Sequence, residues 1–336
     1  MLWHTPFWPH RNWITLRTLM ALISAMFTPL SIADITTTPQ QNKTINFDFA
    51  ISSENHTGHF DWSIASDITG TRSPNVLSEL TYDNLDISDL NYQTAMRWKL
   101  SDTLTGLIEL NVMQGTVNTG QVLDADFIGN DKTKTKSLSQ SNPSGSDLHA
   151  IALAFGLQRY LRPSTHLAFM VGAQEHSQDF IKRNGLQMIT AGNSGIPAVG
   201  TTFTQLNSSY KTNWTSGFVG TRLTQFFGRR QLEWRLDYHR AAYYAEADWN
   251  LRSSFQHPKS FEHLANGHGI LSTLTYRHPL FDHVFLTLSI RHENWQTKDG
   301  MDRLFFANGN TSTTRLIETN WSRRGYGLGL VYRGGQ

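Results

Sequence analysis

The sequence predicts an all-β protein: a closed, ten-stranded antiparallel barrel that spans a membrane. Apolar and polar residues alternate with period two along much of the chain, as in strands with two different faces. Very short connections alternate with long polar ones, which is typical of membrane barrels. A helical multi-span protein is excluded, because mean hydropathy is only −0.39 and no apolar run after residue 33 approaches the ~20 residues of a spanning helix.

The first 33 residues have the layout of a secretory signal peptide. Arg11 and Arg17 precede the apolar stretch 19–27, and small residues follow before the expected cleavage point. The alternatives are a buried helix and a membrane anchor. The stretch is too short for an anchor, which needs ~20 apolar residues to span the membrane. We expect residues 1–33 to be removed and residues 34–336 to form the barrel.

Ten segments carry the strand pattern. The predicted strands are 43–62, 76–100, 103–122, 146–161, 165–183, 205–227, 231–249, 267–280, 284–298 and 315–332. The alternation is clear in the first, second, fourth, ninth and tenth, whose apolar faces carry Phe47 and Phe49; Tyr92 and Trp98; Leu153 and Phe155; Leu286 and Leu288; and Leu328 and Leu330. In the tenth strand, three glycines alternate with the apolar residues and indicate close packing on the inner face.

The connections give the barrel its orientation. The short ones lie at 101–102, 162–164, 228–230 and 281–283, and the long polar ones at 123–145, 184–204, 250–266 and 299–314. Short periplasmic turns and long extracellular loops are the layout of an outer-membrane barrel, and an even number of strands places both ends in the periplasm. Several strands exceed the ~9–11 residues of one crossing, so we expect the barrel to project from the membrane as a rigid cup.

The expected interior is polar. A sheet in lipid must close on itself, and small barrels are filled by side chains. We expect a charged plug, which argues against a general porin and leaves a small-solute channel as an alternative. Its predicted members are Arg97, Lys99, Glu109, Asn111, Arg235, Asp237, His239, Arg291 and Glu293.

Composition excludes some functions. The chain has 29 Lys+Arg against 27 Asp+Glu, and this net charge of +2 is too small for a nucleic-acid footprint. Without cysteine it has neither a disulfide nor a thiolate site.

One acidic motif stands out, Asp124-Ala-Asp126. On a strand the two carboxylates point the same way, so their repulsion must be relieved by a metal, a shared proton or solvent. With Asp131 the pair superficially resembles a calcium loop, but the glycine and terminal glutamate of such a loop are absent. We expect no metal and no other cofactor, apart from lipopolysaccharide as a structural lipid.

Several stretches resemble the omptins, the ten-stranded outer-membrane aspartic proteases. Residues 167–185 are similar to the fifth strand of that family, and 77–82 to the opening of its second strand. Phe127 follows the acidic pair where omptins have Trp, and Tyr210-Lys211 matches a motif of the sixth strand. The resemblance runs colinearly from about residue 43 to the C-terminus and implies a divergent omptin-like barrel in the outer membrane of a Gram-negative bacterium.

The resemblance implies that Asp124 and Asp126 are half of a catalytic cleft that follows the third strand. Its other half is an Asp-x-His after the seventh strand, where this chain has Asn250 and Arg252. Neither replacement exchanges a proton near neutral pH, so we expect no activated water. We expect Arg252 instead to neutralise the acidic pair across the cleft. Asp248 matches an acidic position beside the omptin dyad and is the predicted substrate-binding residue.

Two other sources of a base were weighed. Asp237-Tyr238-His239 is an Asp-x-His, but it lies eleven residues below Asp248, roughly 35 Å along a strand, so a buried ion pair with Arg235 or Arg291 is favoured. The second source is a relocated base, with His257, His263 and His268, which lie in or beside the fourth long loop, as candidates.

The resemblance also implies a lipopolysaccharide site on the outer wall. Glu175 matches its acidic position, while Ala173, Ser177 and Asn213 replace its aromatic and basic positions. We expect this site to be mostly lost.

The functional expectation is therefore surface binding or adhesion through the long loops, without omptin proteolysis. Its partners would be outer-membrane lipid and an extracellular protein or peptide. The alternative is an aspartic endopeptidase with a rebuilt active site that cleaves near basic residues.

Overall fold

The computed structural model describes residues 45–192 and 195–335; the predicted signal peptide lies outside them. One short 3-10 helix, η1 (Asn130–Lys132), accompanies the strands, and no helix in the described ranges is long and apolar enough to cross a membrane. The strands are β1 (Ile45–Ile64), β2 (Ser78–Lys99), β3 (Leu104–Phe127), β4 (Thr135–Asn142), β5 (Asp147–Arg162), β6 (Thr165–Thr190), β7 (Thr202–Phe227), β8 (Arg230–Asp248), β9 (Phe261–Pro279), β10 (Val284–Phe305) and β11 (Thr311–Gly335).

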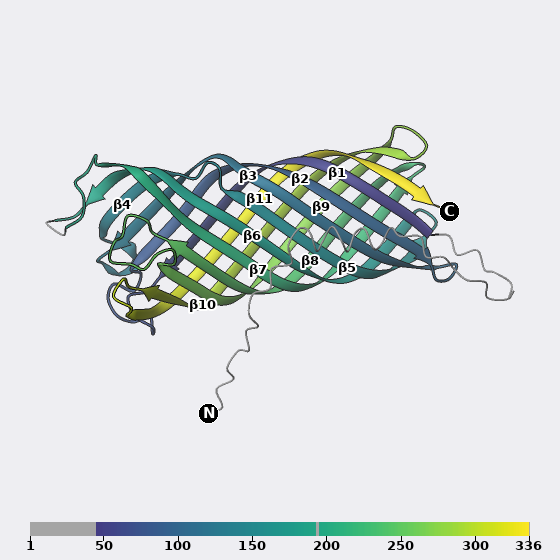
Figure 1. The fold of residues 1–336 in the computed structure, drawn as a ribbon. Helices are drawn as coiled ribbons and strands as arrows, with labels where there is room; N and C mark the ends of the chain where they lie inside the picture. The colour runs from purple at the N-terminus through teal and green to yellow at the C-terminus, as the bar shows by residue number, and fades with distance from the viewer. Residues whose placement is uncertain (1–44, 193–194, 336) are drawn as a thin grey trace, which may run out of the picture. The chain divides into compact units, whose positions relative to one another are not determined.

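The strands close into the predicted ten-stranded antiparallel ring (Figure 1). Consecutive strands pair from β5 through β11, β11 pairs with β1, and β1 continues through β2 to β3. The position between β3 and β6 in the ring is shared by two strands, β5 and β4. β5 pairs with the first half of β3, and β4 pairs with its final residues and with β6. β4 therefore extends the position of β5 toward the long loops.

Six strands (β3, β6, β7, β9, β10 and β11) are longer than predicted, and four predicted loops are partly sheet. The range 123–145 contains the end of β3 and all of β4, while β6, β7, β9 and β10 continue into 184–204, 250–266 and 299–314. These extensions are polar, and polarity was the signal for a loop. Above the membrane, however, the outer wall of the barrel faces water, so a polar residue on that wall is compatible with a strand.

Near the short turns, the barrel is apolar outside and polar inside. This arrangement fits a membrane-spanning band. The exposed apolar band includes Phe47, Phe49 and Ile51 (β1); Leu90 and Tyr92 (β2); Leu153, Phe155 and Leu157 (β5); Phe169 and Val171 (β6); Val219 and Leu223 (β7); Trp234, Leu236 and Tyr238 (β8); Ile270 and Leu274 (β9); Leu288 and Ile290 (β10); and Tyr326, Leu328 and Leu330 (β11).

Toward the long loops the interior is aromatic, which corrects the prediction of a charged interior throughout. Phe180 lies in this core, with its ring centre 4.4 Å from that of Tyr82 and 4.9 Å from that of Phe60. Packed aromatic rings leave no water-filled path, so this core closes the barrel above its polar half. Its ten buried aromatic members are Phe60, Trp62, Tyr82, Phe180, Tyr210, Trp214, Tyr243, Phe261, Trp295 and Trp321.

An irregularity in β2 and β3 sets which residues face inward at the top. Their register shifts between Asp83 and Ile87, opposite Gly120. Gly120 has φ of 154°, and a Cβ there would lie 2.8 Å from Leu85 Cδ2, so a glycine is required. Odd-numbered residues of β3 are buried below this point and Val122 is buried above it. The change of parity turns the upper even-numbered residues toward the interior.

Candidate functional site

The acidic pair lies at the extracellular end of the barrel, on the inner face of β3. Asp124 is opposite Leu80 and Asp126 is opposite Ser78 on β2. We expected the pair in a loop after the third strand; instead, both residues are paired in the sheet with β2 and β4. The backbone of the pair is therefore fixed, and the two carboxylates share one face of a strand.

A buried lysine neutralises the first of these acids. Lys182 on β6 is only 3% exposed, and its Nζ lies 2.5 Å from Asp124 Oδ2. The same ammonium group lies 4.6 Å from the centre of the Trp249 ring, in a cation–π contact. Lys182 thus joins β3 to the end of β8 across the mouth.

The second acid is less well compensated. Burial and the neighbouring Asp124 carboxylate raise the pKa of Asp126 above its ordinary value of 3.8, while Ser78 and the positive charges of Arg252 and Lys136 oppose the increase. Arg252 thus acts on this acid through its charge, whereas the ion pair of Asp124 is with Lys182. We expected Arg252 to neutralise both acids; in the structure, the direct partner of Asp124 is Lys182 of β6.

Asn250 has a structural role. Its Oδ1 accepts hydrogen bonds from Asn207 N (2.9 Å) and Ser208 Oγ (3.1 Å), and its Nδ2 donates to Gln205 O (2.8 Å). All these partners lie at the start of β7, so the side chain secures the turn after β8 to its neighbour. Both the oxygen and the nitrogen of the Asn250 amide are thus engaged by β7.

An Asp–His pair is present, but on a different face. His257 Nδ1 lies 2.5 Å from Asp248 Oδ1, and both side chains are partly exposed. Residues alternate along β8, and the buried Ala247 points inward, so Asp248 lies on the face opposite to the interior. The structure therefore brings Asp248 together with one of the three predicted loop histidines, away from the inward face that carries Asp124 and Asp126.

The other histidines are in strands, not in the loop. His263 is fully buried in β9, with Nδ1 2.7 Å from Tyr210 Oη and Nε2 3.2 Å from Asp302 Oδ1. His268 points outward and lies 2.7 Å from Gln296 Nε2. Neither reaches the acidic pair, because strand pairing fixes both backbones.

The Asp237-Tyr238-His239 sequence forms the expected interior ion pair. Asp237 is fully buried and lies 2.5 Å from Arg235 Nε and 2.6 Å from Arg222 Nη1. His239 Nδ1 contacts Ser216 Oγ at 3.0 Å. The alternative partner Arg291 contacts Glu54 instead.

On the outer wall, Glu175 of β6 accepts a hydrogen bond of 2.6 Å from Asn213 Nδ2 of β7. The structure thus brings together two of the positions expected for a lipopolysaccharide site. No basic side chain in the described ranges forms an ion pair with Glu175.

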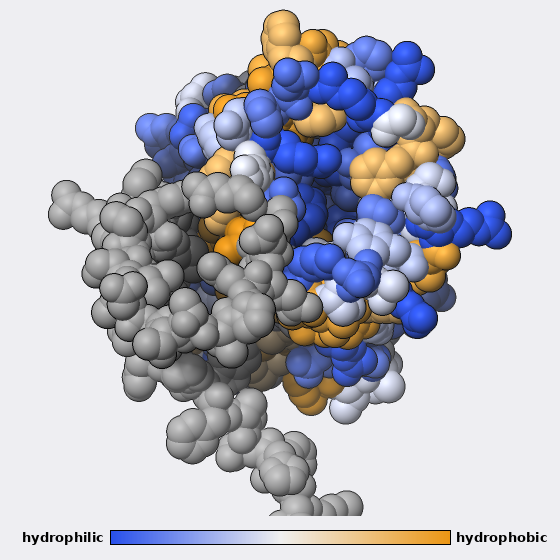
Figure 2. All heavy atoms as spheres, turned by 90° about the vertical axis from the view of Figure 1, so that its right-hand side faces the viewer, coloured by the Kyte–Doolittle hydropathy of each residue, from blue (hydrophilic) through white to orange (hydrophobic). Residues whose placement is uncertain are grey.

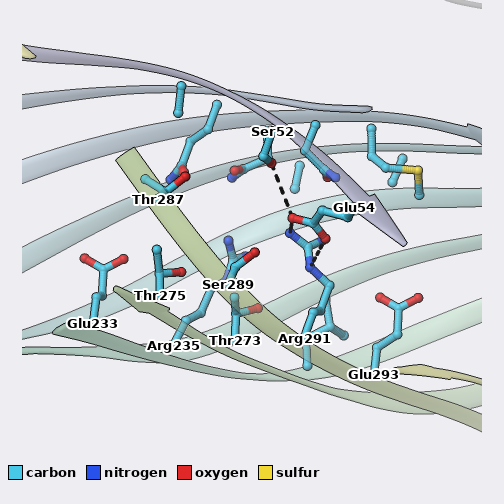
Figure 3. A pocket seen from close by; sticks show the side chains of 18 of the residues that line it. Ser52, Glu54, Glu233, Arg235, Thr273, Thr275, Thr287, Ser289, Arg291 and Glu293 are labelled. Atoms are coloured by element: carbon cyan, nitrogen blue, oxygen red, sulfur yellow. Dashed lines mark hydrogen bonds and ion pairs between the residues drawn. The ribbon is translucent and has the colours of Figure 1, made fainter. Parts of the chain in front are cut away.

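The polar half of the interior contains a cavity of about 110 Å³. Figure 3 shows Arg291 reaching toward Glu54 across it, and their closest atoms are 3.2 Å apart. Seen from the short-turn end, hydrophilic residues surround the recessed centre of the barrel (Figure 2). The aromatic core lies above this cavity and separates it from the long-loop end of the barrel.

One interior cluster has the ligand types of a metal site. His56 Nε2 lies 3.2 Å from Glu54 Oε2 and 3.1 Å from Asp89 Oδ2, all buried. Arg291 and Arg323 already contact these same carboxylate oxygens, at 3.2 and 2.7 Å. The cluster is thus explained as an ion-pair network.

Lys182 and Trp249 were not predicted as site residues. The available signal was inward periodicity, since Lys182 continues the buried series Gln178 and Phe180 on β6. A lysine at a buried position needs an acidic partner, but the sequence does not say which one.

Comparisons with known proteins agree with this architecture. Residues 56–333 match the model of the family described as Protochlamydia outer membrane protein. The outer membrane protease OmpT from Escherichia coli has a similar structure, with a TM-score of 0.67 and 15% identity over 90% of this chain and 99% of that one. The translocator domain of autotransporter NalP from Neisseria meningitidis gives a TM-score of only 0.36 at 10% identity, over 94% and 93% of the two chains. No curated protein sequence matches.

The OmpT likeness confirms the predicted omptin-like fold, and at this identity it shows the fold alone. The family match covers most of the chain, including at least part of every strand of the ring. The chain therefore belongs to the Protochlamydia outer membrane protein family and is an outer-membrane β-barrel.

Proposed function

We propose that this barrel acts at the cell surface by binding, and that it does not carry out omptin-type proteolysis. The observation that supports the proposal is the Lys182–Asp124 ion pair at 2.5 Å. A buried ammonium group needs a counter-charge, so the Asp124 carboxylate is engaged as the partner of Lys182 and is not free to position a water. The half of the site that resembles the omptin acidic pair therefore serves the stability of the mouth.

The other half contains no base. Asn250 is occupied by β7, and the guanidinium of Arg252 stays protonated at working pH. Activation of water near neutral pH needs a group that both accepts and releases protons. Asp126 remains as a carboxyl group with a raised pKa but has no histidine beside it among the contacts described above.

The extracellular loops have side chains suited to contact with another protein. Four loops at the same end each carry an exposed large apolar residue, and such residues at one end favour protein contacts. They are Ile68, Ile128, Val199 and Leu251. The long strands beneath hold these loops on a rigid support, which lowers the entropy cost of binding. An extracellular protein or peptide is the proposed partner.

The second candidate function is an endopeptidase with a rebuilt active site. The Asp248–His257 pair favours it, because a partly exposed histidine oriented by a carboxylate is the usual form of a general base. In that case the substrate would contact the outer side of the β8–β9 loop and not the cleft between β3 and β8.

A peptide assay separates the two functions. The refolded protein is incubated with lipopolysaccharide and a dibasic fluorogenic peptide, and binding to extracellular-matrix proteins is measured in parallel. We expect matrix binding without cleavage. Cleavage that Asp126→Asn abolishes would overturn the binding proposal, and cleavage that only His257→Ala abolishes would assign the reaction to the rebuilt pair.

The channel alternative has its own measurement. Because the aromatic core closes the lumen, we expect no conductance steps from the folded barrel in planar lipid bilayers. Stable steps would restore the small-solute channel.

A further inference from the structure

The outer wall carries a row of basic residues directly above the apolar band. On four consecutive strands, the first outward residue beyond the last exposed apolar residue of the band is Arg or His. The four apolar–basic successions are Tyr238 to Arg240 (β8), Ile270 to His268 (β9), Ile290 to His292 (β10) and Tyr326 to Arg324 (β11). We name these four basic residues the basic row.

The row consists of two directly opposed pairs. Arg240 is opposite His268 on the neighbouring strand, and His292 is opposite Arg324. Directly opposite residues in a sheet have Cβ atoms ~5 Å apart, so each pair presents its side chains together. Between the pairs the register is staggered, since His268 is opposite Gln296, four residues beyond His292. Each member nevertheless stands two residues above the band on its own strand.

The charges of the row are not used within the barrel. In the described ranges, neither Arg240 nor Arg324 forms an ion pair or hydrogen bond with another side chain, and both are exposed. Among the histidines, His268 contacts Gln296 and stacks on the Tyr238 ring at 6.3 Å, while His292 is exposed. Two arginines without acidic partners on one wall are available to an anion from outside.

Most of the other strands lack this feature. The corresponding positions on four of them hold Ser53 (β1), Ser88 (β2), Ala173 (β6) and Gly217 (β7). On β5 the exposed His149 lies above the band, beyond Ile151. The acidic residue Glu175 also lies on this other wall and is bonded to Asn213. The two arginines at the upper edge of the band therefore distinguish β8–β11 from these strands.

From this arrangement we infer a binding site for phosphate-bearing lipid head groups of net negative charge, on the outer wall of β8–β11. The acyl chains lie against the exposed apolar residues of the band, and the phosphate reaches the basic row directly above. Guanidinium groups bind phosphate through two parallel hydrogen bonds, and Tyr238 and Tyr326 lie where aromatic residues commonly mark the membrane interface. The lipid wall inferred here is thus β8–β11, away from Glu175 and Asn213.

The test is native mass spectrometry of the folded barrel in detergent, with phosphatidylglycerol and phosphatidylcholine of the same acyl chains. The test variant carries both substitutions, Arg240→Gln and Arg324→Gln. Its control, Lys211→Gln with Lys298→Gln, removes the same charge from exposed outward residues farther above the band. We expect preferential retention of phosphatidylglycerol, weakened roughly tenfold in the arginine variant and unchanged in the control.

Two further arms complete the experiment. Arg240→Lys with Arg324→Lys keeps the charge and is expected to retain most of the preference. Equal retention of both lipids by the unaltered barrel would overturn the inference, and so would an equal loss in the control. Full displacement of the lipid by inorganic phosphate would assign the row to a free anion. None of these measurements depends on proteolysis or matrix binding, so the inference fails or stands independently of the proposed function.

Discussion

The two halves of the barrel are built with opposite polarity on the same strands. Along β6, Phe169 near the short turns is 63% exposed and faces the outside, whereas Phe180 near the long loops is fully buried in the core. Along β1, Phe49 faces out and Phe60 faces in. The strand geometry is unchanged, so the difference reflects what surrounds the wall: lipid in one half and water in the other.

The interior differs in the same way. The lower half is filled by ion pairs, such as Asp237 with Arg222 and Arg235, and contains the cavity. The upper half is filled by aromatic rings, and the acidic pair lies at its outer end. The interior is therefore polar in the membrane and apolar above it. Above the membrane, both the solvent and the loops are wet, so only in that half does turning apolar side chains inward remove them from water.

The strongest test of this contrast is truncation of an aromatic side chain in each half. We expect Phe180→Ala to destabilise the barrel by about 3–5 kcal/mol, because it leaves a cavity among packed rings. Phe169→Ala, on the same strand but in the lipid-facing band, should cost much less, because lipid fills the space left by the ring. The measurement is urea unfolding in lipid vesicles followed by tryptophan fluorescence. Equal losses would show that the upper half has no independent core.

A charge placed on the outer wall tests where the band ends. Leu288→Arg, near the middle of the band on β10, should destabilise the barrel by about 2–4 kcal/mol, because the guanidinium enters lipid. Asn294→Arg, on the same strand and face but above the band, should change stability by less than about 1 kcal/mol. Both are compared by the same unfolding experiment. A large loss at Asn294 would place the membrane boundary higher than the apolar band does.

The smallest expected effect concerns the mouth and depends on pH. Because the pKa of Asp126 is raised above 3.8 in the folded protein, the native state favours the protonated carboxyl, and stability falls as pH rises through the folded pKa. Asp126→Asn removes this loss, so we expect the variant to gain roughly 1 kcal/mol or less at pH 8 and nothing at pH 4.

Asp124→Asn is the matched control for that experiment. It removes the partner of the buried Lys182 and should destabilise the barrel by about 1–3 kcal/mol at pH 8. Urea unfolding of both variants at pH 4 and pH 8 provides the measurement. If Asp126→Asn were also destabilising at pH 8, the carboxylate would be better compensated than its environment indicates.

Much of the fold was predictable because alternation is a local signal. Residues such as Phe47 and Phe49, or Leu328 and Leu330, alternate with polar residues or glycine, and this pattern gives strand, face and lipid contact together. The short turns gave the orientation, and the need to pair every backbone group in lipid gave the closure. Prediction failed above the membrane, where polar outer residues were assigned to loops, and β4 was missed for that reason.

The sequence by itself determined that this chain is a ten-stranded outer-membrane barrel with an acidic pair near its extracellular end. The tertiary structure alone decided the partners of that pair. The irregularity at Gly120 turns Asp124 and Asp126 inward, and the pairing of β4 with both β3 and β6 brings Lys182 to Asp124, 58 residues away in the sequence. Such pairings depend on strand register and side-chain direction in space, which residue types and local spacing do not specify.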